Sequence, residues 1–178
     1  MSLKKILSLF LLSLSLIGSS IADFSDGLDA YNAGDHKTAL HEWLALAEEG
    51  DVRAQYNVGW MNAYGIGTLQ DHEAAANWYR KSADQGFVHA QFNLGNMYLR
   101  GDGVEKDDAL AFSWFIKAAE QGDAASQYNL CRLYVLGKGV VSNMPEAKHW
   151  CKKAYENNDN NISILAEEVW DKFKLNSY

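Results

Sequence analysis

The sequence predicts an all-α fold of stacked helix pairs, and three observations lead to that prediction. Glycine, glutamine, asparagine and tryptophan residues recur with a period of 36 along most of the chain. Apolar residues within each period follow helical spacing. The chain has 14 glycines but one proline, and most of these glycines fall between the predicted helices. A helix pair of this size buries its apolar face against its neighbours, so a repeat period predicts a solenoid.

Residues 1–22 are predicted to be a signal peptide. Two lysines precede an apolar run over residues 6–18, which is shorter than the roughly 20 residues of a membrane-spanning helix. Small residues at the two positions that a signal peptidase reads predict cleavage after Ala22. The alternative is a membrane anchor that is never removed. Cleavage would release a periplasmic or secreted chain without a stable membrane anchor.

The charge and composition exclude several classes of protein. Removal of Lys4 and Lys5 with the signal would take the formal net charge from −7 to −9. An acidic chain repels phosphates, so no nucleic-acid partner is expected. A chain that is 48% apolar and 12% aromatic is not a disordered tail. Two cysteines are too few for a four-cysteine zinc site.

Three full units are predicted at residues 52–87, 88–123 and 124–159, each made of two helices. In the middle unit, a Gly-x-Gly loop at 101–103 ends the first helix. Asp107 is predicted to cap the second helix, because its carboxylate accepts hydrogen bonds from unpaired N–H groups. Gly122 ends that helix, since glycine tolerates a left-handed turn.

Shorter segments are predicted at both ends of the repeats. Residues 23–51 form a helix pair with a tight turn and no Gly-x-Gly loop. Residues 160–178 contain one amphipathic helix that caps the apolar end of the stack. The apolar stripe of that helix is predicted to contain Ile162, Leu165, Ala166, Val169, Trp170 and Phe173.

The recurring residues resemble the Sel-one-like repeat, a relative of the tetratricopeptide repeat. The resemblance rests on Ala-Gln-Tyr/Phe-Asn-Leu/Val-Gly, then Gly-x-Gly, Ala-x-x-Trp-Tyr/Phe and Ala-x-x-Gly, over about residues 24–159. Residues 23–51 are more similar to a plain tetratricopeptide repeat. The resemblance implies a right-handed α/α superhelical solenoid with a concave face. It also implies an adaptor or scaffold for other proteins, in bacteria often at the cell envelope.

The two cysteines depart from the repeat pattern together. Cys131 occupies the position of Gly59 and Gly95 in the earlier units, and Cys151 occupies the position of an aromatic ring. A glycine that makes room for a ring is replaced along with that ring, so we predict that the two sulfurs form a disulfide. Two buried thiols are the alternative. Cysteine-rich members of the family carry their cysteines at other positions, so their penicillin-binding and β-lactamase-like activities are not transferred to this chain.

No catalytic residue, metal site or cofactor is predicted. The sequence lacks His-Glu-x-x-His, Gly-x-Ser-x-Gly and the phosphate-binding Gly-x-x-x-x-Gly-Lys. His149 lies two residues from Cys151, but residues two apart on a helix do not face each other. An envelope hydrolase of the β-lactamase-like type is therefore kept only as the alternative to a binding protein.

The predicted binding surface is the concave face, which the first helix of each pair lines in such solenoids. Side chains left over from the core are expected to bind a protein or a peptide there. They are Arg53, Tyr56, Asn57, Trp60 and Tyr64 in the first full unit, His89, Phe92, Asn93, Asn96 and Arg100 in the second, and Tyr128, Asn129 and Arg132 in the third.

Three of these residues, Asn57, Asn93 and Asn129, are equivalent and form a predicted asparagine ladder. In related tetratricopeptide proteins, asparagines at this place hold the backbone of an extended peptide with one donor and one acceptor each. The alternative is that they join neighbouring repeats. Trp60 is either an interface anchor or packs on the first helix pair. The arginines would attract a partner's carboxylates. The sequence leaves open an envelope scaffold or an immunity-type inhibitor.

Overall fold

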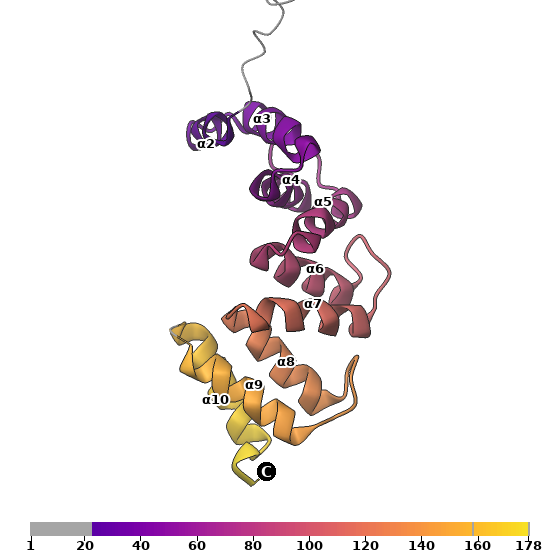
Figure 1. Ribbon diagram of the computed structural model, residues 1–178, viewed down its shortest axis with the longest axis vertical. Helices are drawn as coiled ribbons and strands as arrows, with labels where there is room; N and C mark the ends of the chain where they lie inside the picture. The colour runs from indigo at the N-terminus through magenta and orange to yellow at the C-terminus, as the bar shows by residue number, and fades with distance from the viewer. Residues whose placement is uncertain (1–22, 158, 178) are drawn as a thin grey trace, which may run out of the picture.

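The computed structural model describes residues 23–157 and 159–177, and all of their regular elements are helices (Figure 1). Four successive pairs are followed by a single helix and a short 3-10 turn. In chain order they are α2 (Phe24–Asn32), α3 (His36–Glu49), α4 (Val52–Tyr64), α5 (His72–Asp84), α6 (Val88–Arg100), α7 (Asp108–Glu120), α8 (Ala124–Leu136), α9 (Met144–Glu156), α10 (Asn160–Lys172) and η1 (Leu175–Ser177).

Each helix packs on the helix before it and the helix after it, and α10 also contacts α8. Figure 1 shows the pairs following one another in a curved row from α2 to α10, with the α6–α7 and α8–α9 loops projecting to one side. This arrangement confirms the predicted all-α solenoid of helix pairs. The predicted signal peptide, residues 1–22, lies outside the described residues. Among the helices that are described, none has the length and apolar character to span a membrane.

Acidic side chains begin most of the helices, because their oxygens pair with N–H groups that have no partner within the helix. The predicted cap at Asp107 is confirmed: its Oδ1 accepts from the backbone N–H groups of Ala109 and Leu110, both at 2.9 Å. The helix α6 departs from this pattern, since it begins after Phe87 with no side-chain cap. The Phe87 ring instead packs on Tyr56, with ring centroids 5.1 Å apart.

Glycines on the first helix of each pair allow a ring on the second helix to approach closely. A Cβ atom built on Gly95 would lie 2.8 Å from Cε1 of Phe115, and one built on Gly59 would lie 2.8 Å from Cδ1 of Tyr79. Both contacts are shorter than ordinary van der Waals distance, so neither site accommodates a side chain without movement. This confirms the predicted contact between glycine and ring.

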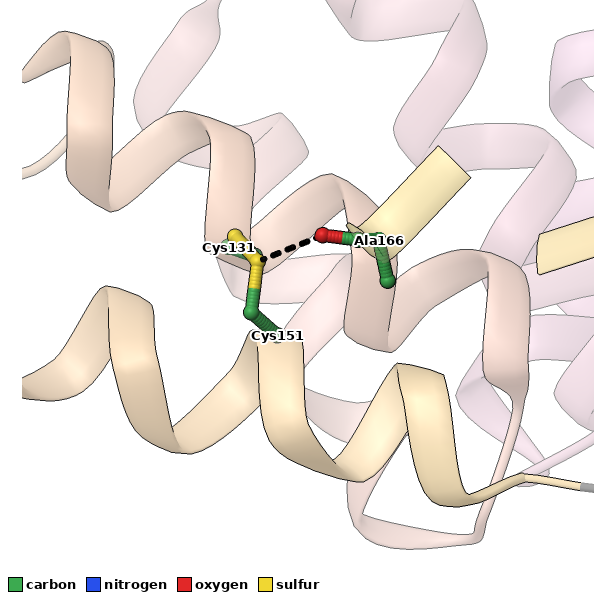
Figure 2. Close-up of a disulfide and its surroundings, with 3 residues drawn as sticks. All are labelled: Cys131, Cys151 and Ala166. Carbon is green, nitrogen blue, oxygen red and sulfur yellow. Dashed lines mark hydrogen bonds between the residues drawn. A yellow bond between two sulfur atoms is a disulfide. The ribbon is translucent and has the colours of Figure 1, made fainter. Parts of the chain in front are cut away.

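The predicted disulfide is present. Cys131 on α8 and Cys151 on α9 are fully buried and bonded, with an S–S distance of 2.06 Å and a Cα–Cα distance of 5.0 Å. The Sγ atom of Cys151 also lies 3.7 Å from the carbonyl oxygen of Ala166 on α10 (Figure 2). A disulfide sulfur carries no proton, so this is a close packing contact. The disulfide therefore joins α8 to α9 directly beneath α10.

Hydrogen bonds between neighbouring pairs run through a set of amide side chains that we call the glutamine relay. Its members are the buried Gln55, Gln91 and Gln127, together with Gln85, Gln121 and Asn157 at the ends of the second helices. Gln91 donates from Nε2 to the Ala83 carbonyl at 3.2 Å, and its Oε1 accepts from Nε2 of Gln121 at 2.9 Å. Gln121 also donates to the Gly86 carbonyl. The same bonds recur one repeat earlier and one repeat later. The relay satisfies carbonyls at the end of one pair with side chains from the next.

The apolar stripe of α10 is divided between two surroundings. Ala166 is buried, and Val169, Trp170 and Phe173 pack partly buried against the core of α8 and α9. Leu165, in contrast, is 37% exposed. The stripe was predicted to cover the end of the stack as a whole, but only its C-terminal part packs on the core.

Candidate functional site

A groove of about 460 Å³ opens among the described helices. Its walls come from α4, α5, α6, α8 and α10, together with the loops after α4 and α6. Seven of the predicted binding residues line it: Tyr64, Phe92, Asn93, Asn96, Arg100, Tyr128 and Asn129. The volume falls within the range of typical ligand sites in proteins. We call this concavity the groove.

Two tyrosines from neighbouring helices set the surroundings of Asn93. Burial raises the pKa of Tyr79, and a hydrogen bond with the Asn93 side chain lowers that pKa in part. Burial also raises the pKa of Tyr56, again offset in part by Asn93. Tyr79 is almost fully buried, and part of it reaches the groove. Hydrogen bonds with two tyrosines of the preceding helix pair therefore hold the Asn93 side chain in place.

The three members of the predicted asparagine ladder are not equivalent in the structure. Asn93 and Asn129 line the groove, whereas Asn57 does not. Asn57 and Asn129 make no side-chain hydrogen bond to another described residue, whereas Asn93 bonds with Tyr56 and Tyr79 of the preceding pair. An amide has one acceptor and one donor group to satisfy. The Asn129 amide is therefore available to a ligand, and Asn93 offers a ligand the part of its amide that the tyrosines leave unused.

The predicted arginines lie in three different surroundings. Arg100 is exposed at the groove and has no ion pair with a described residue. Arg53 lies outside the groove, where its guanidinium stacks 4.2 Å from the Phe24 ring centroid and pairs with Asp51 at 3.7 Å. Arg132 lies 5.6 Å from the Tyr128 ring centroid and lines two smaller pockets beside the groove. Only Arg100 of the three gives the groove a positive charge.

Aromatic residues near the N-terminal end pack mainly on one another. Trp60 is partly buried. The centroid of its ring lies 5.9 Å from that of Tyr31 on α2 and 5.5 Å from that of Tyr64. This contact favours the alternative in which Trp60 packs on the first helix pair. His89 stacks 6.0 Å from Tyr56, and neither residue lines the groove.

Several groove residues were not predicted. Gln70 and Asp102 come from the loops after α4 and α6, His72 begins α5, and Ile162 and Leu165 come from α10. The 36-residue period predicted the loops, but it could not show that they reach the groove. The α10 residues were assigned to the cap. The rest of the lining comes from Ala63, Met97 and Ala125 on the first helices and from Tyr79 on α5.

The groove offers hydrogen-bonding groups and aromatic surface. Four of its polar side chains are amides, its titratable side chains include His72 and Asp102, and its rings include those of Phe92 and Tyr128. Away from the groove, the thiol of Cys151 is tied up in the disulfide, so it cannot pair with His149 as a nucleophile. Within the described chain, no group of three histidine, cysteine or acidic side chains is arranged to hold a metal ion.

Comparison with solved structures gives a consistent family. A Sel1 repeat protein from Oxalobacter formigenes is 34% identical with a TM-score of 0.74, over 79% of this chain and 58% of its own. The protein c5321, a protective antigen of uropathogenic Escherichia coli with an SLR fold, is 37% identical with a TM-score of 0.67, over 69% and 26%. The chain thus spans less than two thirds of either relative.

A third structure, Helicobacter pylori cysteine rich protein B, shares the fold at 20% identity and a TM-score of 0.57, over 72% of this chain and 92% of its own. Comparison with curated proteins gives no match. The Sel1 repeat family model matches residues 52–87, 88–123 and 124–159. Sel1 repeats generally mediate interactions between proteins, and their fold is typically a non-catalytic scaffold. The chain therefore belongs to the Sel1 repeat family.

Proposed function

We propose that this protein is an exported scaffold that binds an extended segment of another protein in the groove. The observation that carries the proposal is the pair of asparagines, Asn93 and Asn129, which face the same groove from successive repeats. An extended backbone presents N–H and C=O groups at regular intervals, and each asparagine amide matches one of each. The neighbouring rings of Phe92 and Tyr128 provide surface for the side chains of such a segment.

The disulfide supports the exported location. Disulfides form and persist in oxidising compartments, whereas cytosolic thiols are kept reduced. The bond between Cys131 and Cys151 is buried and closes a loop of 20 residues within the last repeat, so it is part of the packed fold. A periplasmic or secreted chain satisfies this requirement. An envelope-complex scaffold and an immunity-type inhibitor both remain compatible with a binding groove.

Replacing Asn93 and Asn129 together with alanine is expected to weaken binding of an extended peptide by at least about tenfold, because each lost amide removes hydrogen bonds to the ligand backbone. Peptides selected from a displayed random library against the wild-type protein are the probes, and fluorescence anisotropy gives the dissociation constants. The matched control is Asn57→Ala, which changes the equivalent position outside the groove and should alter the affinity less than about twofold.

Thermal unfolding of the same variants separates binding from packing. The double variant is expected to show only a small fall in melting temperature, because it removes the Asn93 bonds with Tyr56 and Tyr79 but keeps the glutamine relay between the repeats. A large fall in the melting temperature with unchanged affinity of the folded protein would show that the asparagines join repeats instead. Equal losses for Asn57→Ala and the groove variant would place the ligand elsewhere.

A further inference from the structure

The helix α10 gives the groove an apolar end wall that the packing of the solenoid does not use. Ile162 and Leu165 line the groove, although both belong to the apolar stripe expected to cap the stack. Leu165 remains 37% exposed, whereas its neighbour Ala166 is 1% exposed. An apolar side chain left exposed beside a polar groove is typical of an interaction site.

The rotation of α10 about its own axis is fixed by contacts of its apolar face further along the helix. Ala166 packs against the disulfide through its carbonyl oxygen, 3.7 Å from Sγ of Cys151 (Figure 2). Val169 and Phe173 pack on the same core one and two turns later. Residues three and four apart share a helix face, so Ile162 continues this face one turn before Ala166, and Leu165 lies at its edge, where the face lines the groove. The wall is therefore positioned before any ligand arrives.

The groove is consequently divided into two chemically different ends. At the α8–α10 end, Ala125 and Tyr128 stand with Ile162 and Leu165 and make an apolar subsite. At the other end the lining is polar and includes Gln70, His72, Asp102 and the exposed guanidinium of Arg100. Arg100 has no ion pair with a described residue, so its charge is available to an anionic group. Asn93 and Asn129 line the same groove as the residues of these two ends.

We propose that the groove selects an extended segment of a partner protein that carries a large apolar side chain for the α10 subsite and a carboxylate for Arg100. The proposal rests on the proposed function and adds the chemistry of the ligand. The apolar side chain supplies affinity through burial against Ile162 and Leu165. The carboxylate supplies orientation, because a guanidinium pairs with it in a defined geometry.

The test uses the full chain without its predicted signal and peptides selected from a displayed random library. Selected peptides are expected to share a large apolar residue and an acidic residue. The variant Leu165→Ser should weaken binding of such a peptide by about tenfold or more, because it removes most of the apolar contact. The matched control is Ile164→Ser on the same helix, which removes a side chain that is 58% exposed and does not line the groove. It should change the affinity less than about twofold.

A thermodynamic cycle assigns the contact to the apolar residue. Replacing that residue of the peptide with alanine should lower the affinity for the wild-type protein about tenfold and the affinity for the Leu165→Ser variant much less. Arg100→Gln should abolish the preference for an acidic over an amidated peptide. Equal peptide affinities of the wild type and Leu165→Ser would overturn the apolar subsite. If Asn93→Ala/Asn129→Ala still weakens peptide binding in that case, the proposed function stands. Binding that is insensitive to both variants overturns the groove altogether.

A second copy of the chain is the competing occupant of this wall. Sedimentation equilibrium of the free protein decides between the two. A concentration-dependent dimer that Leu165→Ser abolishes and Ile164→Ser preserves would show that the wall is a self-association surface, and it would overturn the peptide proposal. A monomer for all three proteins is the expected result.

Discussion

Loss of the Cys131–Cys151 disulfide is expected to lower the free energy of unfolding by about 3 kcal/mol. The bond closes a loop of 20 residues, so breaking it restores conformational freedom to the unfolded chain. Both cysteines are fully buried, and the change is felt in the core shared by α8, α9 and α10. Urea unfolding followed by circular dichroism, with and without a reductant, measures the difference. The variant Cys131→Ala/Cys151→Ala should unfold at a lower urea concentration than the oxidised wild type.

Two controls isolate the bond from the side chains. Reduction of the wild type breaks the bond but keeps both sulfurs in place, so it measures the bond itself. The double alanine variant should be insensitive to reductant. Amide hydrogen exchange should rise first in α9 and α10, because Ala166 packs directly on the disulfide. Unchanged unfolding of the wild type after complete reduction would contradict a stabilising role.

The disulfide and the helix pairs were accessible from the sequence because each is defined by residues in register. Gly95 opposite Phe115 in one repeat and Cys131 opposite Cys151 in the next are the same contact with different side chains. The first helix pair contains a further contact between a glycine and a ring, because a Cβ atom on Gly27 would overlap the Trp43 ring. Trp43 stays in register with Tyr79, but the shorter loop of the first pair shifts Gly27 out of the 36-residue register, so the period gave no signal for this glycine.

The groove was predicted less completely, since it depends on how elements approach in space. Asn93 and Asn129 line one groove, whereas Asn57, which was predicted to share their surface, lies outside it. Leu165 shows the limit most clearly. An apolar stripe on α10 indicates burial, yet the stripe is wider than the core beneath it. Which edge stays exposed depends on the position of Ala166 against the disulfide, and that is a tertiary contact.

The glutamine relay illustrates the same limit with polar residues. The period of Gln55, Gln91 and Gln127 was visible, but periodicity alone does not distinguish a buried hydrogen bond from a surface feature. Within its own helix pair, Gln91 accepts from Gln121, which is 30 residues away, and both side chains donate to carbonyls at the end of the preceding pair, those of Ala83 and Gly86. The relay therefore joins the repeats through bonds from side chains to carbonyls, without using the Asn129 amide. Loss of the glutamine relay is therefore expected to have the second large effect on the stability of the fold.

Replacing Gln91 with leucine is expected to lower the free energy of unfolding by about 2 kcal/mol. Gln91 is 3% exposed, so the variant leaves the Ala83 carbonyl without its side-chain donor and Gln121 without its acceptor in a buried setting. Gln121 is exposed and retains water as a partner, so Gln121→Leu should cost less. Chemical unfolding of both single variants and the double variant measures each loss. The double variant should lose less than the two single losses together, because Gln91→Leu already removes the shared hydrogen bond.

The last repeat offers a matched comparison for this prediction. There Asn157 takes the place of Gln121, and its shorter side chain reaches Oε1 of Gln127 only at 3.4 Å, against 2.9 Å in the middle repeat. A longer hydrogen bond is weaker, so Asn157→Leu should couple less strongly to Gln127→Leu than Gln121→Leu couples to Gln91→Leu. Strictly additive losses in the middle repeat would contradict the relay, since two residues that share a hydrogen bond cannot act independently. Coupling that falls from the middle repeat to the last would show that the relay's contribution follows the length of its hydrogen bonds, with the weakest bond inside the repeat that carries the disulfide.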